Sequence, residues 1–148
     1  AISCVMEIDN NGKTVDYEIF PSIIKSRLQM TYKKVNQVIE KNEIPEGYEP
    51  FVNDLKLMDE LSQIIRKAKI NRGYIDFDVD EAKIIVDENC HPTDIVLRNR
   101  GRGENLIEDF MIQANECVAT HIFYMDLPFI YRVHEYPKEE KIRDPKIS

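Results

Sequence analysis

The sequence has 148 residues, of which 43% are hydrophobic, with 5 glycines and 7 prolines. This composition supports one buried core and leaves little room for a disordered linker, so we expect one domain or part of one. The net charge of -7 argues against a general nucleic-acid-binding surface, because phosphate contacts depend on Lys and Arg. No run of about 18 apolar residues could span a bilayer, and residues 1–7 do not resemble a signal peptide. We therefore expect a soluble, cytoplasmic protein with no membrane partner.

The three cysteines, Cys4, Cys90 and Cys117, are odd in number and widely spaced. They include no Cys-x-x-Cys pair, so they fit neither a disulfide framework nor a zinc site. We expect reduced thiols with a structural role.

The first third of the chain predicts a hairpin followed by a helix. Polar and apolar residues alternate over 3–8 and over 14–20, and the Asn11-Gly12 pair between them suits a tight turn. Apolar residues at helical spacing predict a helix over 30–41, which ends before the turn at 45–47.

A second helix and a strand follow. The helix should end at Gly73, and strict alternation over 75–80 predicts a half-buried strand after it. The apolar stripe of this helix consists of Phe51, Leu55, Met58, Leu61, Ile65 and Ala68.

The remaining pattern predicts three more strands, one long helix and a frayed tail at 136–148. Together with the hairpin, these elements predict a mixed α+β fold with mostly antiparallel strands and three main helices. The strands are expected at 82–87, 94–98 and 129–134, and the helix at 104–125. The residues expected on its buried face are Ile107, Phe110, Met111, Ala114, Val118, His121 and Ile122.

Two charged clusters are candidates for a site. Asp76, Asp78 and Asp80 share one strand face, but neighbours on that face stand about 7 Å apart, too far to crowd around one ion. We therefore predict no metal site there. The alternating arginines of 98–102 precede a helix start, where free backbone N–H groups favour anions, so Arg98, Arg100 and Arg102 are candidate RNA-binding residues. The alternative is a solvated basic turn.

Three runs, at 72–77, 103–119 and 127–135, resemble the catalytic RNB domain of the ribonuclease R and ribonuclease II exoribonucleases. The resemblance covers nearly all of residues 1–148. It implies a segment of a processive 3′-to-5′ hydrolytic exoribonuclease that uses Mg²⁺ to release 5′-nucleoside monophosphates from single-stranded RNA. The family's clustered catalytic aspartates and flanking RNA-binding barrels have no match here. We therefore expect a partial catalytic domain without catalytic or metal-binding residues of its own, inactive in isolation, in which the Mg²⁺ ligands lie mostly outside the segment.

The resemblance also implies two aromatic residues that stack on the last bases at the RNA 3′ end. The run at 27–32 places one at Tyr32, and the run at 73–77 places the other at Phe77. Stacking suits an enzyme that tolerates any sequence, because every base has a π-face. The alternative for both residues is ordinary core packing.

A family glutamate that helps select RNA over DNA matches Glu108, whose carboxylate could accept a hydrogen bond from a 2′-hydroxyl. Asn115 and Glu116 follow about two turns later and are further candidate RNA-binding residues, with a solvated helix face as the alternative. A different function also stays open, in which this chain is a non-catalytic structural module whose acidic surface binds a protein partner.

Overall fold

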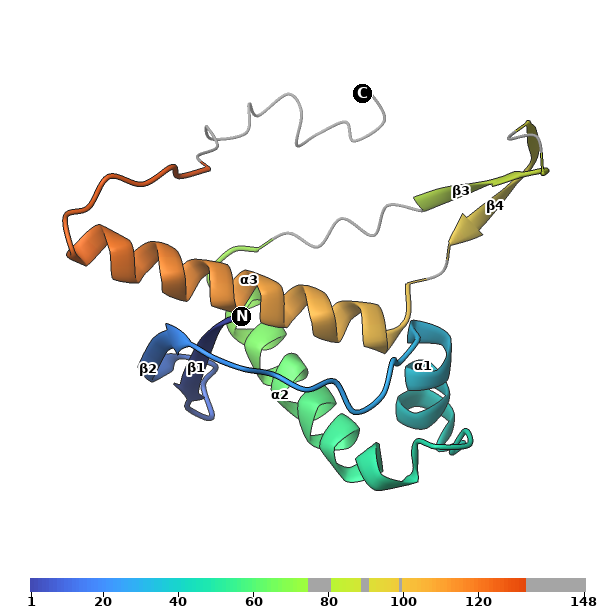
Figure 1. The fold of residues 1–148 in the computed structure, drawn as a ribbon, viewed down its shortest axis with the longest axis horizontal. Coiled ribbons are helices and arrows are strands. Elements are labelled where there is room, and N and C mark those ends of the chain that lie inside the picture. Colours follow the sequence, from blue (N-terminus) through green and yellow to red (C-terminus); the bar gives the residue numbers. More distant parts are fainter. Residues whose placement is uncertain (75–80, 89–90, 99, 133–148) are drawn as a thin grey trace. The chain divides into compact units, whose positions relative to one another are not determined.

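The computed structural model describes residues 1–74, 81–88, 91–98 and 100–132, with backbone only for 81–83 and 95–98 (Figure 1). Three α-helices and two antiparallel two-stranded sheets lie in this part of the chain, which confirms the predicted α+β class. The predicted strand at 75–80 and the predicted frayed tail at 136–148 lie outside it. The elements are β1 (Ile2–Ile8), β2 (Thr14–Pro21), α1 (Tyr32–Lys41), the 3-10 turn η1 (Glu49–Phe51), α2 (Val52–Asn71), β3 (Glu81–Val86), β4 (Pro92–Arg98) and α3 (Arg102–Tyr124).

The N-terminal hairpin forms as predicted. Strands β1 and β2 pair from Ile2 opposite Pro21 to Ile8 opposite Thr14. The Asp9 carboxylate closes the turn by accepting hydrogen bonds of 2.9 Å from two backbone N–H groups within it. Gly12 adopts a φ of 76° there, the left-handed region that glycine enters without steric cost.

Helices α1 and α2 enclose the main apolar core. The Thr31 hydroxyl accepts a hydrogen bond of 3.4 Å from the backbone of Lys34, so α1 begins just after its cap. Asn42, with a φ of 54°, ends the helix. The buried core residues between these helices are Val38, Tyr48 and Leu55, with Leu28, Met30, Val35, Phe51 and Val52 packed against them.

The predicted buried face of α3 is wrong for two residues, whereas Phe110, Ala114, Val118, His121 and Ile122 are partly buried. Ile107 and Met111, both expected inside, are 39% and 59% exposed. The buried face is half polar because α2 supplies hydrogen-bonding partners for it. Its buried residues are Gly103, Leu106, Asp109, Gln113 and Cys117.

The chain divides into two compact units, Ala1–Val118 and Ala119–Ser148. In the second unit, the predicted strand at 129–134 is wrong for residues 129–132, which form no strand. The rings of Phe129 and Tyr131 instead pack edge to face, with their centroids 5.2 Å apart. No helix in the described part of the chain is long and apolar enough to cross a membrane.

The turn of the first hairpin packs tightly on α2. A Cβ added to Gly12 would stand 2.6 Å from the Cβ of Ala68 and 2.9 Å from the Ile64 carbonyl oxygen. We expect Gly12→Ala to suffer both a left-handed backbone penalty of about 1 kcal/mol and a packing penalty of about 1–3 kcal/mol. Gly47→Ala is the matched control, because Gly47 has a φ of 82° but nothing within 4 Å of its added Cβ. Urea unfolding of both variants measures the difference, and equal losses would contradict the tight contact.

Candidate functional site

The carboxylate of Asp109 is the centre of a buried polar cluster between α2 and α3. Its side chain is fully buried. Ser62 donates to its Oδ2 at 2.8 Å and Lys69 donates to its Oδ1 at 2.8 Å. Arg66 Nε donates to Oδ2 at 3.1 Å. Because Lys69 is itself only 3% exposed, the charges of this cluster compensate each other away from water.

A chain of contacts leads from this buried cluster to Glu108. The Lys69 ammonium lies 4.4 Å from the centre of the Tyr74 ring and makes a cation-π contact with it. The Tyr74 hydroxyl in turn donates to Glu108 Oε1 at 3.2 Å. The position of the Glu108 carboxylate is thereby coupled to the ion pair behind it.

Glu108 is held by cations as well. Arg100 Nη1 donates to its Oε2 at 3.3 Å, and Arg66 Nη2 lies 3.9 Å from its Oε1. The Glu108 side chain remains 28% exposed. The structure therefore presents a carboxylate that is fixed in place and still reachable from solvent.

The first backbone N–H groups of α3 donate hydrogen bonds to side chains of α1. The backbone N–H of Gly103 donates to Asn36 Oδ1 at 2.6 Å, and that of Arg102 donates to Glu40 Oε1 at 2.8 Å. An added Cβ on Gly103 would stand 2.9 Å from the same Asn36 oxygen, so a larger residue here would displace the Asn36 side chain. The prediction of free N–H groups for an anion at this helix start is wrong for these two, because α1 already supplies their acceptors.

Two arginines of the predicted cluster pair with carboxylates. Arg100 pairs with Glu108, and Arg102 pairs with Asp59 through its guanidinium. Both arginines remain about two-fifths exposed, at 41% and 44%. The side chain of Arg98 lies outside the described part of the structure.

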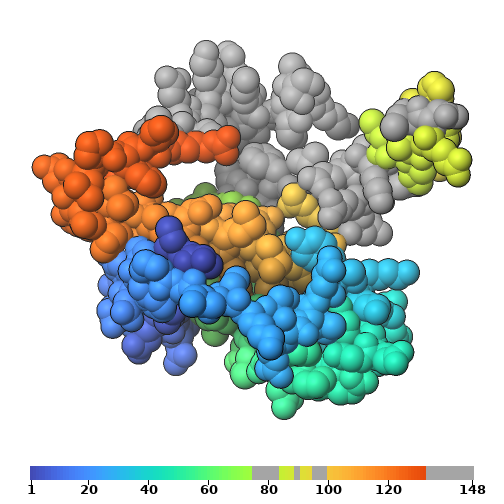
Figure 2. Space-filling model, viewed as in Figure 1, coloured from blue at the N-terminus to red at the C-terminus, as the bar shows by residue number. Residues whose placement is uncertain are grey.

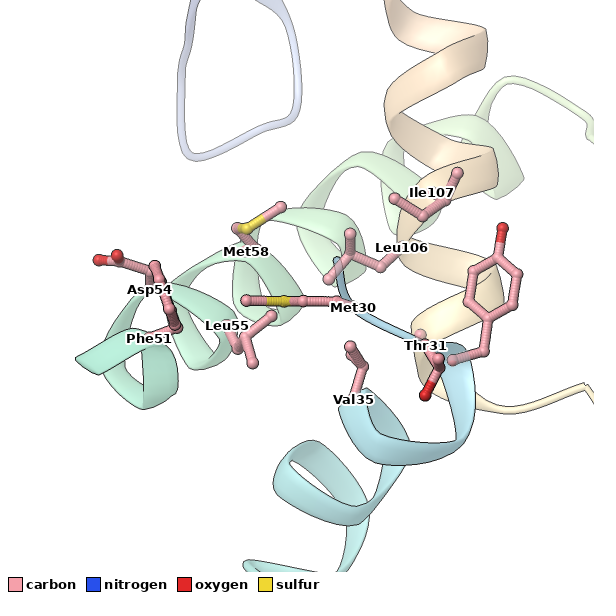
Figure 3. A pocket seen from close by; sticks show the side chains of 11 residues that line it. Met30, Thr31, Val35, Phe51, Asp54, Leu55, Met58, Leu106 and Ile107 are labelled. Carbon is pink, nitrogen blue, oxygen red and sulfur yellow. The ribbon is translucent and has the colours of Figure 1, made fainter. Parts of the chain in front are cut away.

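Tyr32 lies at the first position of α1 and is 43% exposed, so it is not a core residue. It lines a cavity of about 680 Å³ among α1, α2 and α3. In Figure 3 the side chains of Met30, Met58 and Leu106 converge on this space. The other lining residues are Thr31, Val35, Phe51, Asp54, Leu55, Gly103 and Ile107.

The remaining predicted RNA-binding residues are dispersed. Phe77 lies outside the described residues. Asn115 is exposed on α3, and Glu116, 47% exposed, pairs with Arg72 at 3.3 Å. The structure therefore pairs Glu108 with Arg100 and Glu116 with Arg72.

The described residues do not fit a magnesium site. They contain no group of three or more His, Cys, Asp or Glu side chains that could hold a metal ion. The buried carboxylate of Asp109 already receives three donors, two of them cationic. Such a carboxylate is a poor ligand for a hard cation, which needs several unpaired oxygen donors.

Sequence reasoning missed the buried cluster. Its signal is the polar spacing of Ser62, Arg66 and Lys69, which places three donors along one face of α2. On α3, Asp109 lies one residue beyond the glutamate that the resemblance selected, and two neighbouring acidic residues on a helix face different directions. Apolar periodicity could not show which of them turns inward.

The family model of the RNB domain matches residues 1–147, so the chain belongs to the RNB domain family. Ribonuclease R 1 of Lactococcus lactis subsp. lactis (strain IL1403) is 48% identical over 142 residues, which are 95% of this chain and 17% of that protein. Ribonuclease R of Thermotoga maritima is 47% identical over 142 residues, or 95% of this chain and 20% of that protein. The chain thus spans about a fifth of the length of these relatives.

Solved structures agree with this assignment. Mycoplasma genitalium RNase R in complex with ribose methylated single-stranded RNA matches with a TM-score of 0.87 and 30% identity, over 96% of this chain and 22% of that one. The same enzyme in complex with double-stranded RNA matches with a TM-score of 0.86 and 30% identity, over 96% of this chain and 25% of that one. The fold of this chain is therefore that of the corresponding part of RNase R.

The Asp109 cluster predicts a large and specific loss of stability. Asp109→Asn removes the charge that compensates buried Lys69, and breaking a buried ion pair from one side costs about 3–5 kcal/mol. Asp54→Asn on the exposed side of α2 is the matched control and should cost less than about 1 kcal/mol. Urea unfolding followed by circular dichroism measures both. A loss for Asp109→Asn no larger than that of the control would contradict the role of the ion pair.

Proposed function

We propose that this chain is the RNA-channel part of the catalytic domain of a 3′-to-5′ exoribonuclease, which degrades single-stranded RNA processively to 5′-nucleoside monophosphates. The observation that carries the proposal is the match to RNase R bound to single-stranded RNA, at a TM-score of 0.87 over 96% of the chain. The complete enzyme would use Mg²⁺ held mostly by residues outside this segment, and it would act in the cytoplasm. No contact in the described part of the chain favours the alternative of a non-catalytic interaction module.

Glu108 would accept a hydrogen bond from a 2′-hydroxyl of the RNA. The hydrogen bonds from Tyr74 and Arg100 use one acceptor site on each of its two oxygens. An ionised carboxylate offers about four such sites, so acceptor capacity remains for a ligand. Preorganisation supports this role, because a carboxylate that is already held loses little freedom when substrate binds.

Tyr32 would stack on a base near the RNA 3′ end. The residue is 43% exposed and lines the largely apolar cavity of about 680 Å³. An exposed ring beside an apolar cavity can cover one base face and exclude water from it, and such stacking contributes about 1–3 kcal/mol per base. Phe77 would provide the second stacking surface.

The remaining candidates would contact the RNA backbone. Arg100 and Arg102 keep 41% and 44% of their side chains exposed, so guanidinium N–H groups can also donate to phosphate oxygens. Arg98 would act in the same way. Asn115 and Glu116 would contribute polar contacts farther along α3.

Glu108→Ala in the full-length parent tests the discrimination between RNA and DNA. Loss of one hydrogen bond to a charged acceptor costs about 1.5–3 kcal/mol. We therefore expect a roughly ten- to hundredfold weaker preference for an all-RNA 3′ end over one with terminal deoxyribonucleotides. The ratio of kcat/KM values on the two oligonucleotides is the measurement.

Two controls separate this role from a structural one. Glu60→Ala removes an exposed glutamate of α2 and should leave the preference unchanged. Glu108→Gln keeps one acceptor oxygen and should fall between the wild type and Glu108→Ala. If Glu108→Ala slows both substrates equally, Glu108 serves only to hold Arg100 and Tyr74.

Tyr32→Ala in the parent should change the length of the oligonucleotide that remains at the end of digestion, because the stacked tyrosine holds the final bases. Gel analysis of the end product measures this length. Tyr17→Ala on the first hairpin is the matched control, since Tyr17 is also exposed, at 37%, but does not line the cavity. An unchanged end product for Tyr32→Ala would remove Tyr32 from the proposed site.

A further inference from the structure

We propose that Cys4 and Cys117 are a redox-active pair that closes to an intramolecular disulfide when the protein meets a peroxide. The two sulfur atoms lie 3.6 Å apart, although 113 residues separate them in the sequence. Both thiols are free in this structure. A disulfide needs a sulfur-to-sulfur distance of about 2.05 Å, so the atoms must approach each other by only about 1.5 Å.

Independent contacts hold the hairpin and α3 together around this pair. Gln113, one helical turn before Cys117, donates from its side-chain amide to Thr14 Oγ1 on β2 at 2.8 Å. The turn of the same hairpin packs on α2 at Gly12, as described above. Figure 2 shows the atoms of the blue hairpin against those of orange α3. The sulfur contact therefore belongs to a packed interface rather than to two loose ends.

The two thiols have different surroundings, and this difference indicates which of them reacts first with the peroxide. Cys4 is only partly buried on β1, whereas Cys117 is 6% exposed. Burial raises the pKa of the Cys117 thiol to about 11, with a further contribution from the neighbouring Cys4 thiol. Since the thiolate is the nucleophile, Cys4 is the thiol that meets the oxidant first.

The chemistry proceeds in two balanced steps. The Cys4 thiolate attacks one oxygen of hydrogen peroxide, the O–O bond breaks, and a sulfenic acid and one water form once the proton is transferred. Cys117 sulfur then attacks the Cys4 sulfur, the S–O bond breaks, and the second water leaves with the Cys117 proton. The peroxide is reduced and two thiols become one disulfide. Proximity compensates for the low thiolate fraction of Cys117, because the second step is intramolecular.

The disulfide would tie the N-terminal strand covalently to the helix that carries Glu108. In the reduced state, the side chains of Cys117 and Gln113 both contact the hairpin, and these contacts are non-covalent. Oxidation would thus fix the packing of β1 on α3 without changing the charge of the polar face of the helix. A small thiol could reverse the bond by exchange.

The test uses the unmutated 148-residue chain, treated with hydrogen peroxide and then blocked with iodoacetamide. Three cysteines allow three intramolecular pairings. Peptide mapping by mass spectrometry should find the Cys4 to Cys117 pairing as the main product, lost again after dithiothreitol. A mixture of pairings, only intermolecular dimers, or closure only in denaturant would overturn the proposal.

Single variants test the order of the steps. Cys117→Ala should leave a Cys4 sulfenic acid that dimedone captures, whereas the wild type should give several-fold less adduct because the disulfide forms first. Cys90→Ser is the matched control and should still form the disulfide. Circular dichroism of each variant establishes that it is folded. Dimedone capture in Cys4→Ala but not in Cys117→Ala would overturn the assignment of Cys4 as the first thiol.

Discussion

The buried carboxylate of Asp109 determines how α2 and α3 meet. An isolated charge at a position with no exposed surface would be strongly unfavourable, so Ser62, Arg66 and Lys69 must all face it. These three donors lie along one side of α2, and only one rotation of α3 brings Asp109 opposite them. The ion pair therefore sets the rotation of the first part of α3, up to Val118, and with it the direction in which the neighbouring side chains point.

Glu108 owes its exposure to this rotation. Neighbouring residues on a helix point about 100° apart, so burial of Asp109 turns Glu108 toward the edge of the α2 and α3 interface. There Tyr74 couples it to Lys69, the same cation that pairs with Asp109. The proposed RNA contact and the structural ion pair thus share one network, in which a change at the buried end is transmitted to the exposed carboxylate through two contacts.

Hydrophobic periodicity predicted most elements, because the hairpin and the three helices each have a regular local pattern. It missed the fully buried row of α3, since that row combines Leu106 and Cys117 with Asp109 and Gln113. A polar residue is buried only where another element supplies its partners, and such partners are remote in sequence. The resemblance to a family selected Tyr32 and Glu108, whose exposure is compatible with binding. The pairing of Arg100 with Glu108 and of Arg102 with Asp59 depends on tertiary contacts that no local pattern contains.

The hydrogen bonds between the start of α3 and the side chains of α1 have a consequence for folding. Its first N–H groups are bonded to Asn36 and Glu40, which lie 67 and 62 residues earlier in the chain. Most helices obtain their caps from adjacent residues and can form their first turn locally. Here the first turn becomes fully bonded only after α1 has docked, which is a contact of high sequence separation. The amide protons of Arg102 and Gly103 should therefore exchange with solvent whenever α1 detaches, even while the rest of α3 stays helical.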